Sequence, residues 1–124
     1  MAIVGVGTDI VSLERIKEVK RRKAFAAKVL SARELEVYQG FSLELKQIEF
    51  LAGRWAVKEA IYKAIPDFCQ GYAYNQFTIL NGPDGKPHLM GPDYSGNLQL
   101  SISHEKNYAV AFVVVESFPA TEPS

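Results

Sequence analysis

The first part of the chain combines one short apolar run with amphipathic segments. Residues 3–11 are apolar and β-branched at several positions, which predicts a strand. Gly5 and Gly7 interrupt this run and indicate that the strand passes close to another backbone. A helix is predicted next over residues 12–23, because a serine stands at its start as an N-cap, and a short helical segment follows at residues 25–30.

The middle of the chain carries the strongest helix signals. Ser31 and Glu34 have the spacing of a capping box, in which each side chain satisfies a free backbone amide, and Gly40 supplies the stop. Residues 43–65 then place apolar side chains largely on one side at helical spacing, until Pro66 prevents continuation. This segment is the longest helix that the sequence predicts.

Strand patterns fill the remainder of the chain. Two short segments, residues 76–80 and 88–90, flank a turn rich in glycine and proline. Residues 97–103 alternate between apolar and polar side chains, and residues 108–116 are nearly all apolar, as in a central strand. Residues 104–107 make the hairpin turn between these two strands. The fold class is therefore α+β, with helices first and antiparallel strands afterwards.

Length and composition favour one domain. A chain of 124 residues with 48% hydrophobic content can bury roughly two thirds of its unfolded surface. We expect a single domain over residues 1–116 and a flexible tail over residues 117–124, whose prolines and small polar residues cannot pack. No basic leader or bilayer-length apolar window is present, and the single cysteine, Cys69, rules out an internal disulfide. These features favour a cytoplasmic protein with no membrane partner.

The charge is balanced overall but uneven along the chain. Lys+Arg and Asp+Glu both count 14, so no field of the whole molecule attracts nucleic acid or membrane. Half of the positive charge nevertheless gathers in the first helical region, which could dock an acidic helical protein or a nucleic acid. On one helix, Arg15, Val19 and Arg22 would share a face that mixes charge with an apolar contact, which favours a protein partner. The cluster consists of Arg15, Lys17, Lys20, Arg21, Arg22, Lys23 and Lys28.

Three separate segments offer complementary chemistry. The long helix carries Glu59 four residues before Lys63, Asp9 lies near the end of the first strand, and His104 follows an alternating strand. Two carboxylates, an ammonium and an imidazole could together hold a metal ion and a phosphate. Each residue alone also has a plainer interpretation: a helix-stabilising ion pair for Glu59 and Lys63, a cap for Asp9, and a solvated turn residue for His104.

Four motifs together resemble one known family. They occur in order along nearly the whole chain, and the long helical motif is highly specific. The motifs are Gly7-Thr-Asp-Ile-Val11, Phe50-Leu-Ala-Gly-Arg-Trp-Ala-Val-Lys-Glu-Ala-Ile-Tyr-Lys-Ala64, Asp84-Gly-Lys-Pro87 and Leu100-Ser-Ile-Ser-His104. The family that they resemble is that of the holo-acyl carrier protein synthases, the small bacterial type of 4'-phosphopantetheinyl transferase.

The resemblance implies a fold, a reaction and a metal. The fold would be 4'-phosphopantetheinyl transferase-like, with an N-terminal strand and helices, one of them long, packed on an antiparallel sheet. The reaction would transfer the 4'-phosphopantetheine group of coenzyme A to a serine of apo-acyl carrier protein, for fatty acid biosynthesis, and release adenosine 3',5'-bisphosphate. By motif, Asp9 and Glu59 would be the Mg²⁺ ligands, and Lys63 would neutralise charge on the pyrophosphate. These three are the expected catalytic residues, with Glu59 assisting the general base.

The resemblance also implies binding surfaces and an assembly. Because the carrier protein is acidic, the basic first helix becomes its expected docking surface, with Arg15, Arg22 and Lys28 in contact. The family forms homotrimers with the sites at subunit interfaces, and no nucleic acid partner is expected. The residues expected around coenzyme A are Lys63, His104, Arg54, Lys46, Asp84, Gly85, Lys86 and Pro87.

Two positions depart from the family pattern. Residues 65–71 replace a glycine-rich turn that the family commonly has near the pyrophosphate, and Glu105 follows the histidine where a small hydroxyl residue is frequent. Two other functions compete with the enzyme: a non-catalytic module that binds an acidic protein, and a basic RNA-binding protein. Binding alone would not require Asp9, Glu59 and Lys63 together, and the chain lacks the glycine and aromatic signatures of common RNA modules.

Overall fold

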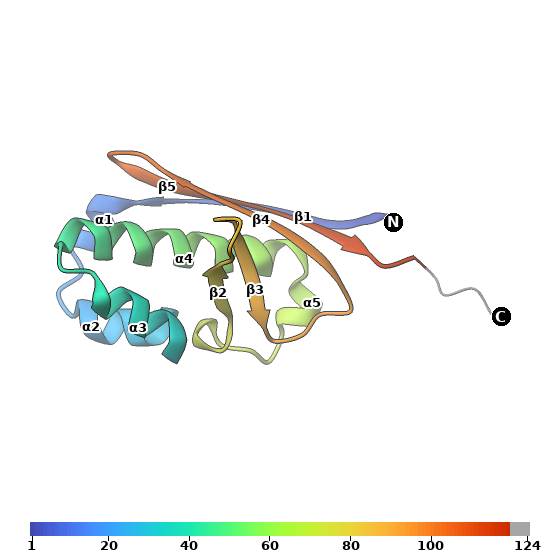
Figure 1. Cartoon of the computed structure of the whole chain (residues 1–124), viewed down its shortest axis with the longest axis horizontal. Helices are drawn as coiled ribbons and strands as arrows, with labels where there is room; N and C mark the ends of the chain where they lie inside the picture. The colour runs from blue at the N-terminus through green and yellow to red at the C-terminus, as the bar shows by residue number, and fades with distance from the viewer. Residues whose placement is uncertain (120–124) are drawn as a thin grey trace.

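A three-stranded antiparallel sheet carries both the first and the last strand of the protein. Its strands are β1 (Ile3–Ser12), β4 (Gly96–His104) and β5 (Tyr108–Ser117), in the order β1-β5-β4. The apolar segment at residues 108–116 is therefore the central strand, as predicted. In this computed structural model, residues 1–119 are described, and the long helix lies along one face of the sheet (Figure 1). The predicted flexible tail covered residues 117–124: Ser117 ends β5, and residues 120–124 lie outside the described residues.

The predicted helix over residues 12–23 is too long, and the helical segment predicted at residues 25–30 begins at Arg22, so this part of the chain forms two short helices. They are α1 (Leu13–Lys17) and α2 (Arg22–Val29), and a turn separates them. Helix α1 buries Leu13 and Ile16, whereas α2 buries Ala26 and Val29. A single straight helix could not bring both apolar pairs against the long helix, so burial of apolar surface favours the break.

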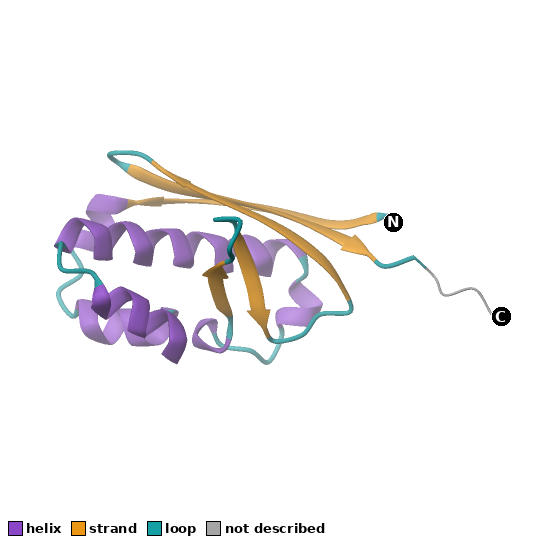
Figure 2. Ribbon diagram, viewed as in Figure 1, coloured by secondary structure: helices purple, strands orange, loops and turns teal. Residues whose placement is uncertain are grey.

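The remaining elements follow the predicted order. The capping box of Ser31 and Glu34 is present, with Ser31 N–H donating to Glu34 Oε1 at 2.8 Å and Glu34 N–H donating to Ser31 Oγ at 3.3 Å. A small two-stranded sheet and two short helical turns follow the long helix, as Figure 2 shows. Before them come α3 (Ala32–Gly40) and the long helix α4 (Glu44–Ala64). The elements after the long helix are α5 (Pro66–Cys69), the 3₁₀ turn η1 (Tyr74–Gln76), β2 (Thr78–Asn81) and β3 (Pro87–Gly91).

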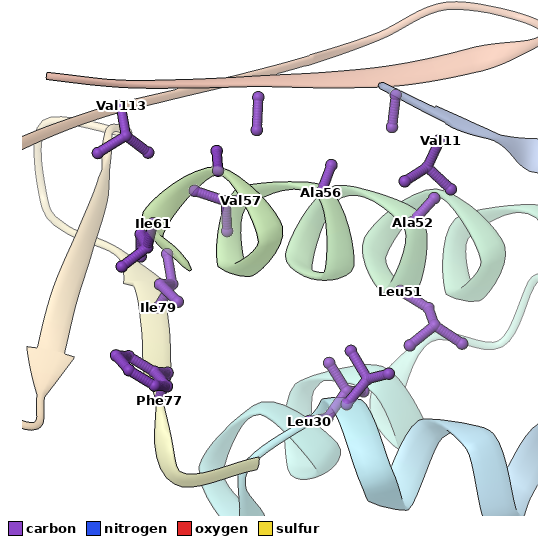
Figure 3. Packing of buried hydrophobic residues seen from close by; sticks show 14 of the residues in the cluster. Val11, Leu30, Leu51, Ala52, Ala56, Val57, Ile61, Phe77, Ile79 and Val113 are labelled. Atoms are coloured by element: carbon purple, nitrogen blue, oxygen red, sulfur yellow. The ribbon is translucent and has the colours of Figure 1, made fainter. Parts of the chain in front are cut away.

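Helix α4 is buried on opposite sides because two layers enclose it. Ala52 and Ala56 face the three-stranded sheet, whereas Leu51 points toward Leu30 at the end of α2 and Ile61 packs near β2 (Figure 3). A helix that is apolar around most of its circumference is typical of a protein interior. The long helix therefore fixes the relative positions of both sheets and of α2.

Close contact between β1 and α4 depends on two glycines. A Cβ atom at Gly5 would collide with the carbonyl oxygen of Ala64, and one at Gly7 with that of Ala60. The predicted close approach of the first strand to another backbone is confirmed. It matters for function because it brings Asp9, two residues after Gly7, to the carboxyl-terminal half of α4.

One ion pair lies completely inside the protein. Glu34 and Lys58 have side chains that are 0% exposed, and Lys58 Nζ lies 2.5 Å from Glu34 Oε1. Lys58 also donates to the carbonyl oxygens of Val29 and Tyr74, and Glu34 Oε2 accepts from Ile79 N–H at 2.8 Å. The pair ties α3, α4, η1 and β2 together.

The segment at residues 65–71 folds as the single turn α5. Its Phe68 ring packs against Phe77 and Tyr94, with ring centroids 6.3 and 4.9 Å away. Within residues 1–119, no helix has both the length and the apolar character needed to cross a membrane.

Candidate active site

Asp9 lies on the face of β1 that meets the long helix. Its register partner on β5 is Ala111, which is buried, and the Asp9 side chain is 19% exposed. Lys63 of α4 reaches this position: its Nζ lies 3.0 Å from Asp9 Oδ1 and donates to the carbonyl oxygen of Thr8 at 3.1 Å. The structure thus joins two predicted catalytic residues that stand far apart in the sequence.

Glu59 lies on the same helix, one turn before Lys63. The simple ion pair between these two residues is not among the ion pairs of residues 1–119, since Lys63 pairs with Asp9 instead. Glu59 Oε1 accepts a hydrogen bond from the hydroxyl of Tyr74 at 2.7 Å. Burial, followed by this hydrogen bond and the nearby charges of Glu59 and Asp9, raises the pKa of Tyr74, so the phenol is a hydrogen-bond donor.

The two carboxylates form a donor set suited to a hard cation. Asp9 and Glu59 are both partly exposed, and the negative charge of each raises the pKa of the Tyr74 phenol. Mg²⁺ prefers oxygen ligands and is usually held by one or two carboxylates together with substrate phosphates and water. Within residues 1–119, no cluster of three or more His, Cys, Asp or Glu side chains suits a metal ion. A site with two protein carboxylates leaves coordination positions for a phosphate.

A cavity of about 430 Å³ lies at the other half of α4. Its walls come from α4, β4 and the turn between β2 and β3, and they combine cations with aromatic and glycine surfaces. Lys63, Asp84 and Lys86, which were expected to bind coenzyme A, are outside the lining of this cavity. Five of the expected coenzyme A residues do line it: Lys46, Arg54, Gly85, Pro87 and His104.

Glu49 is a residue of this cavity that the sequence reasoning missed. Its Oε2 lies 3.0 Å from His104 Nδ1, and its Oε1 lies 3.5 Å from Lys46 Nζ. The carboxylate therefore holds two of the predicted binding residues in position. Its spacing of three residues from Lys46 on a helix was a signal in the sequence, but the contact with His104 depends on β4 packing against α4. Glu105 does not face the cavity, because its Oε1 accepts from Asn107 N–H at 2.9 Å within the turn.

Arg54 has a structural role in addition to lining the cavity. Its Nε donates to the carbonyl oxygen of Ile79 at 3.0 Å, its Nη2 donates to Asn81 Oδ1 at 3.4 Å, and its guanidinium stacks over the Phe50 ring at 4.4 Å. Burial lowers the pKa of Arg54, and the negative charge of Glu34 partly opposes this effect. Arg54 therefore joins β2 to the wall of the cavity.

The turn between β2 and β3 organises itself around Asp84. Its Oδ1 accepts from Lys86 N–H at 3.0 Å and lies 3.1 Å from His88 Nε2. The hydrogen bond from the Lys86 amide, followed by the contact with His88, lowers the pKa of Asp84. Gly85 has φ of 80°, a left-handed conformation that favours glycine. The sequence predicted His88 as the start of a strand, but its contact with Asp84 was not predicted.

The predicted docking residues lie on helices α1 and α2. Arg15 is exposed on α1 and stacks over Trp55 of α4 at 5.4 Å, and Lys28 is exposed on α2. Arg22 opens α2, where its Nη1 lies 3.3 Å from Glu44 Oε1 and its Nη2 donates to the carbonyl oxygen of Lys17. The expectation that Arg15 and Arg22 share a face of one helix is wrong, because the chain turns between them.

Comparison with known proteins gives the family and the relatives. Residues 5–113 match the model of the 4'-phosphopantetheinyl transferase superfamily. The chain is 43% identical to the holo-[acyl-carrier-protein] synthase of Aliivibrio fischeri, over 94% of this chain and 100% of the relative. It is also 42% identical to the holo-[acyl-carrier-protein] synthase of Lactococcus lactis subsp. cremoris, over 92% of this chain and 98% of the relative.

Solved structures agree with the sequence relatives. A crystal structure of a holo-(acyl-carrier-protein) synthase from Bacillus anthracis in complex with CoA (3',5'-ADP) superposes with a TM-score of 0.80 at 37% identity, covering 94% of this chain and 98% of the other. The holo-[acyl-carrier-protein] synthase of Neisseria meningitidis gives a TM-score of 0.78 at 32% identity, with 94% and 100% covered. The similarity therefore extends through the carboxylate pair and the cavity.

Proposed function

The chain belongs to the 4'-phosphopantetheinyl transferase superfamily, and from this premise we propose that it is a holo-[acyl-carrier-protein] synthase. It transfers the 4'-phosphopantetheine group from coenzyme A to a serine of apo-acyl carrier protein in the cytoplasm, for fatty acid biosynthesis. The observation that carries the proposal is the convergence of Asp9 and Lys63, from distant parts of the chain, beside Glu59.

The proposed reaction is a phosphoryl transfer. The serine hydroxyl oxygen attacks the phosphorus next to pantetheine, and a new O–P bond forms as the P–O bond to the departing phosphate breaks. The serine proton passes to a base assisted by Glu59, and adenosine 3',5'-bisphosphate leaves. Lys63 stabilises the negative charge that builds on the leaving phosphate, because its side chain is 55% exposed and its ammonium lies 3.0 Å from Asp9 Oδ1.

Mg²⁺ is the metal that fits the proposed site. Asp9 and Glu59 would hold it, since carboxylate oxygens are the ligands that a hard cation prefers. When bound, the ion supplies a positive charge that polarises the phosphoryl oxygens. Side chains of the protein hold the two carboxylates: Lys63 orients Asp9, and the Tyr74 hydroxyl donates a hydrogen bond to Glu59.

The cavity beside His104 is the proposed binding site for the nucleotide end of coenzyme A. Lys46, Arg54 and His104 provide cationic or donor groups for a phosphate, and Gly85 and Pro87 leave an open surface for a ring. The Glu49 carboxylate, 3.0 Å from His104 Nδ1, holds the imidazole ring at the wall of the cavity. Lys86 and Asp84 would act from the rim, outside the cavity lining.

We further propose a homotrimer whose sites combine two subunits. Asp9 lies on one edge strand and His104 on the other, with β5 between them, and Glu49 and Lys63 are about 21 Å apart along α4 at 1.5 Å per residue. A site composed of the carboxylate pair of one copy and the cavity of a second copy accounts for this separation.

The outer face of the sheet supports such an assembly. Val6, Ile10 and Phe112 point away from α4 and are 52%, 61% and 45% exposed. Val6 is the register partner of Val114 and Ile10 that of Val110, and Phe112 lies between these two pairs on β5. A contiguous apolar face of this kind is typical of a protein interface. Phe112→Lys should produce monomers in analytical ultracentrifugation and lower the transfer rate. A variant that stayed trimeric, or a monomer with full activity, would contradict the proposal.

The basic surface of α1 and α2 is the proposed docking site for the carrier protein. Arg15→Glu with Arg22→Glu should raise the KM for the carrier protein by about tenfold at low salt, because complementary charge mainly governs encounter and orientation. The affinity for coenzyme A should stay unchanged, and Arg33→Glu on exposed α3 serves as the control. Equal losses for both substrates would contradict the docking assignment.

One assay tests the function as a whole. The protein is incubated with coenzyme A, Mg²⁺ and an apo-acyl carrier protein, and the carrier is examined by mass spectrometry. A gain equal to one phosphopantetheine group is expected, and it should disappear when a chelator removes the metal. Absence of any gain, under conditions in which an established synthase modifies the same carrier, would refute the proposed function.

A further inference from the structure

Tyr74 makes a direct hydrogen bond to the proposed catalytic carboxylate. It lies on η1, in the segment after α5, and its hydroxyl donates to Glu59 Oε1 at 2.7 Å. The residue is half-buried, so solvent competes weakly for this bond. The contact joins a loop segment to a helix fifteen residues away.

Both polar ends of Tyr74 are held by neighbouring residues of α4. Its carbonyl oxygen accepts from Lys58 Nζ at 3.0 Å, and its hydroxyl donates to Glu59, the next residue of the chain. Lys58 is itself fixed by its pair with Glu34, in which both side chains are fully buried. Tyr74 is therefore anchored through Lys58 to a fully buried ion pair.

The ring and the local backbone of Tyr74 are fixed as well. The ring packs on Tyr62 with centroids 4.9 Å apart and planes at 32°. The turn that carries the residue is closed by Gln76 Oε1, which accepts from Ala73 N–H at 2.7 Å. The hydroxyl consequently has little freedom to move away from Glu59.

We infer that Tyr74 is a positioning residue that sets which oxygen of Glu59 faces the metal. A carboxylate has two oxygens with about four acceptor positions. The Tyr74 hydroxyl occupies Oε1 and fixes the plane of the carboxylate, which leaves Oε2 directed to the ion and to the incoming serine. This inference rests on the proposed function, since it assigns Glu59 to the metal.

The magnitude follows from the behaviour of groups that orient metal ligands. Mutation of such a partner typically lowers metal affinity or activity by about 10- to 100-fold. The effect should appear in metal binding itself, because the disturbed element is the orientation of a ligand. The docking of the carrier protein, which uses α1 and α2, should be unaffected.

The test compares two phenol deletions on adjacent rings. Tyr74→Phe removes the hydroxyl and keeps the ring contact with Tyr62. Tyr62→Phe is the matched control, because the Tyr62 hydroxyl donates to the carbonyl oxygen of Tyr72 and not to a carboxylate. Mn²⁺ binding to each protein in the presence of coenzyme A, without carrier protein, is measured by electron paramagnetic resonance. Tyr74→Phe should bind Mn²⁺ about tenfold more weakly than the wild type, and Tyr62→Phe should match the wild type.

A second variant separates positioning from a general structural role. In a Glu59→Gln background, Tyr74→Phe should cause no further loss of Mn²⁺ affinity, because the two residues act as one unit. Independent, additive losses would overturn the inference, as would unchanged Mn²⁺ affinity in Tyr74→Phe alone. With phosphopantetheine transfer by the wild type intact, either result removes the role of Tyr74 and leaves the proposed function in place. A wild type that transfers the group but binds no divalent ion would overturn both the metal site and this inference.

Discussion

Two of the lysine–carboxylate contacts on helix α4, Lys58–Glu34 and Lys63–Asp9, differ in what surrounds them. Lys58 and Glu34 are fully buried, and each makes several further hydrogen bonds to backbone groups. Lys63 and Asp9 are 55% and 19% exposed, and Asp9 has no backbone amide bound to its carboxylate among the hydrogen bonds of residues 1–119. Pairing alone therefore does not distinguish an ion pair that stabilises the fold from one that is available for chemistry. The further hydrogen bonds made by the charged groups do distinguish them.

The physical reason lies in the cost of removing charge from water. A buried ion pair persists only where additional hydrogen bonds satisfy the remaining lone pairs and protons, and nothing is then left to bind a substrate. Burial lowers the pKa of Lys58, and the charge and hydrogen bond of Glu34 oppose that shift. Partly exposed carboxylates such as Asp9 and Glu59 keep oxygens available for a cation.

The largest expected effect comes from breaking the buried pair. Lys58→Met should lower the free energy of unfolding by about 3–5 kcal/mol, because it leaves the Glu34 charge buried without a cation. Urea denaturation monitored by the fluorescence of Trp55 measures the change. A loss smaller than that of an exposed ion pair would show that the contrast between the two pairs is wrong.

Neutralising the open cluster should affect chemistry more than stability. Glu59→Gln should lower kcat/KM for phosphopantetheine transfer by about 10²-fold or more, since it would remove both a proposed metal ligand and the group proposed to assist the base. The unfolding free energy should change little, because the amide oxygen can still accept from Tyr74. Glu36→Gln, on the exposed face of α3, is the control and should retain full activity.

A smaller stability effect is expected at the exposed lysine. Lys63→Met should change the unfolding free energy by less than about 1 kcal/mol, because a solvent-exposed ion pair gains little in water. The substitution is chemically identical to Lys58→Met and lies on the same helix, so urea denaturation of the two variants compares the pairs directly. Similar losses of unfolding free energy in both variants would contradict the distinction between the buried pair and the exposed pair.

Salt should produce the smallest difference. At 1 M NaCl the Debye length is about 3 Å, so the contribution of the Asp9–Lys63 pair to stability should disappear. The loss caused by Lys58→Met should remain, because solvent ions do not reach that pair. Repeating both denaturation series at low and high salt measures the two responses, and a salt-sensitive Lys58→Met penalty would contradict the burial argument.

Much of the fold could be predicted from local patterns. The capping box at Ser31, the end of α4 before Pro66 and the central position of β5 each depend on a few neighbouring residues, and all are confirmed. The first helix was predicted too long, because Ser12 marks its start and no glycine or proline in residues 13–23 marks its end. The break between them is set by packing against α4, which no local pattern contains.

The candidate site divides in the same way. The long helical motif around Glu59 and Lys63 identified the chemistry, since its residue types and spacing are specific. The partners of these side chains could not be found in the sequence: Lys63 contacts Asp9 instead of Glu59, Tyr74 binds Glu59, and Glu49 holds His104. Each partner is brought in by another element.

The sequence by itself determined the class of this protein, the order of most of its elements and the residue types of its site, because these depend on spacing along the chain. The tertiary structure decided which charged side chains pair with one another. Gly5 and Gly7 allow β1 to approach α4, and this approach brings Asp9 to Lys63. Contacts between side chains far apart in the sequence arise from the packing of whole elements, and that packing is an outcome of the complete fold.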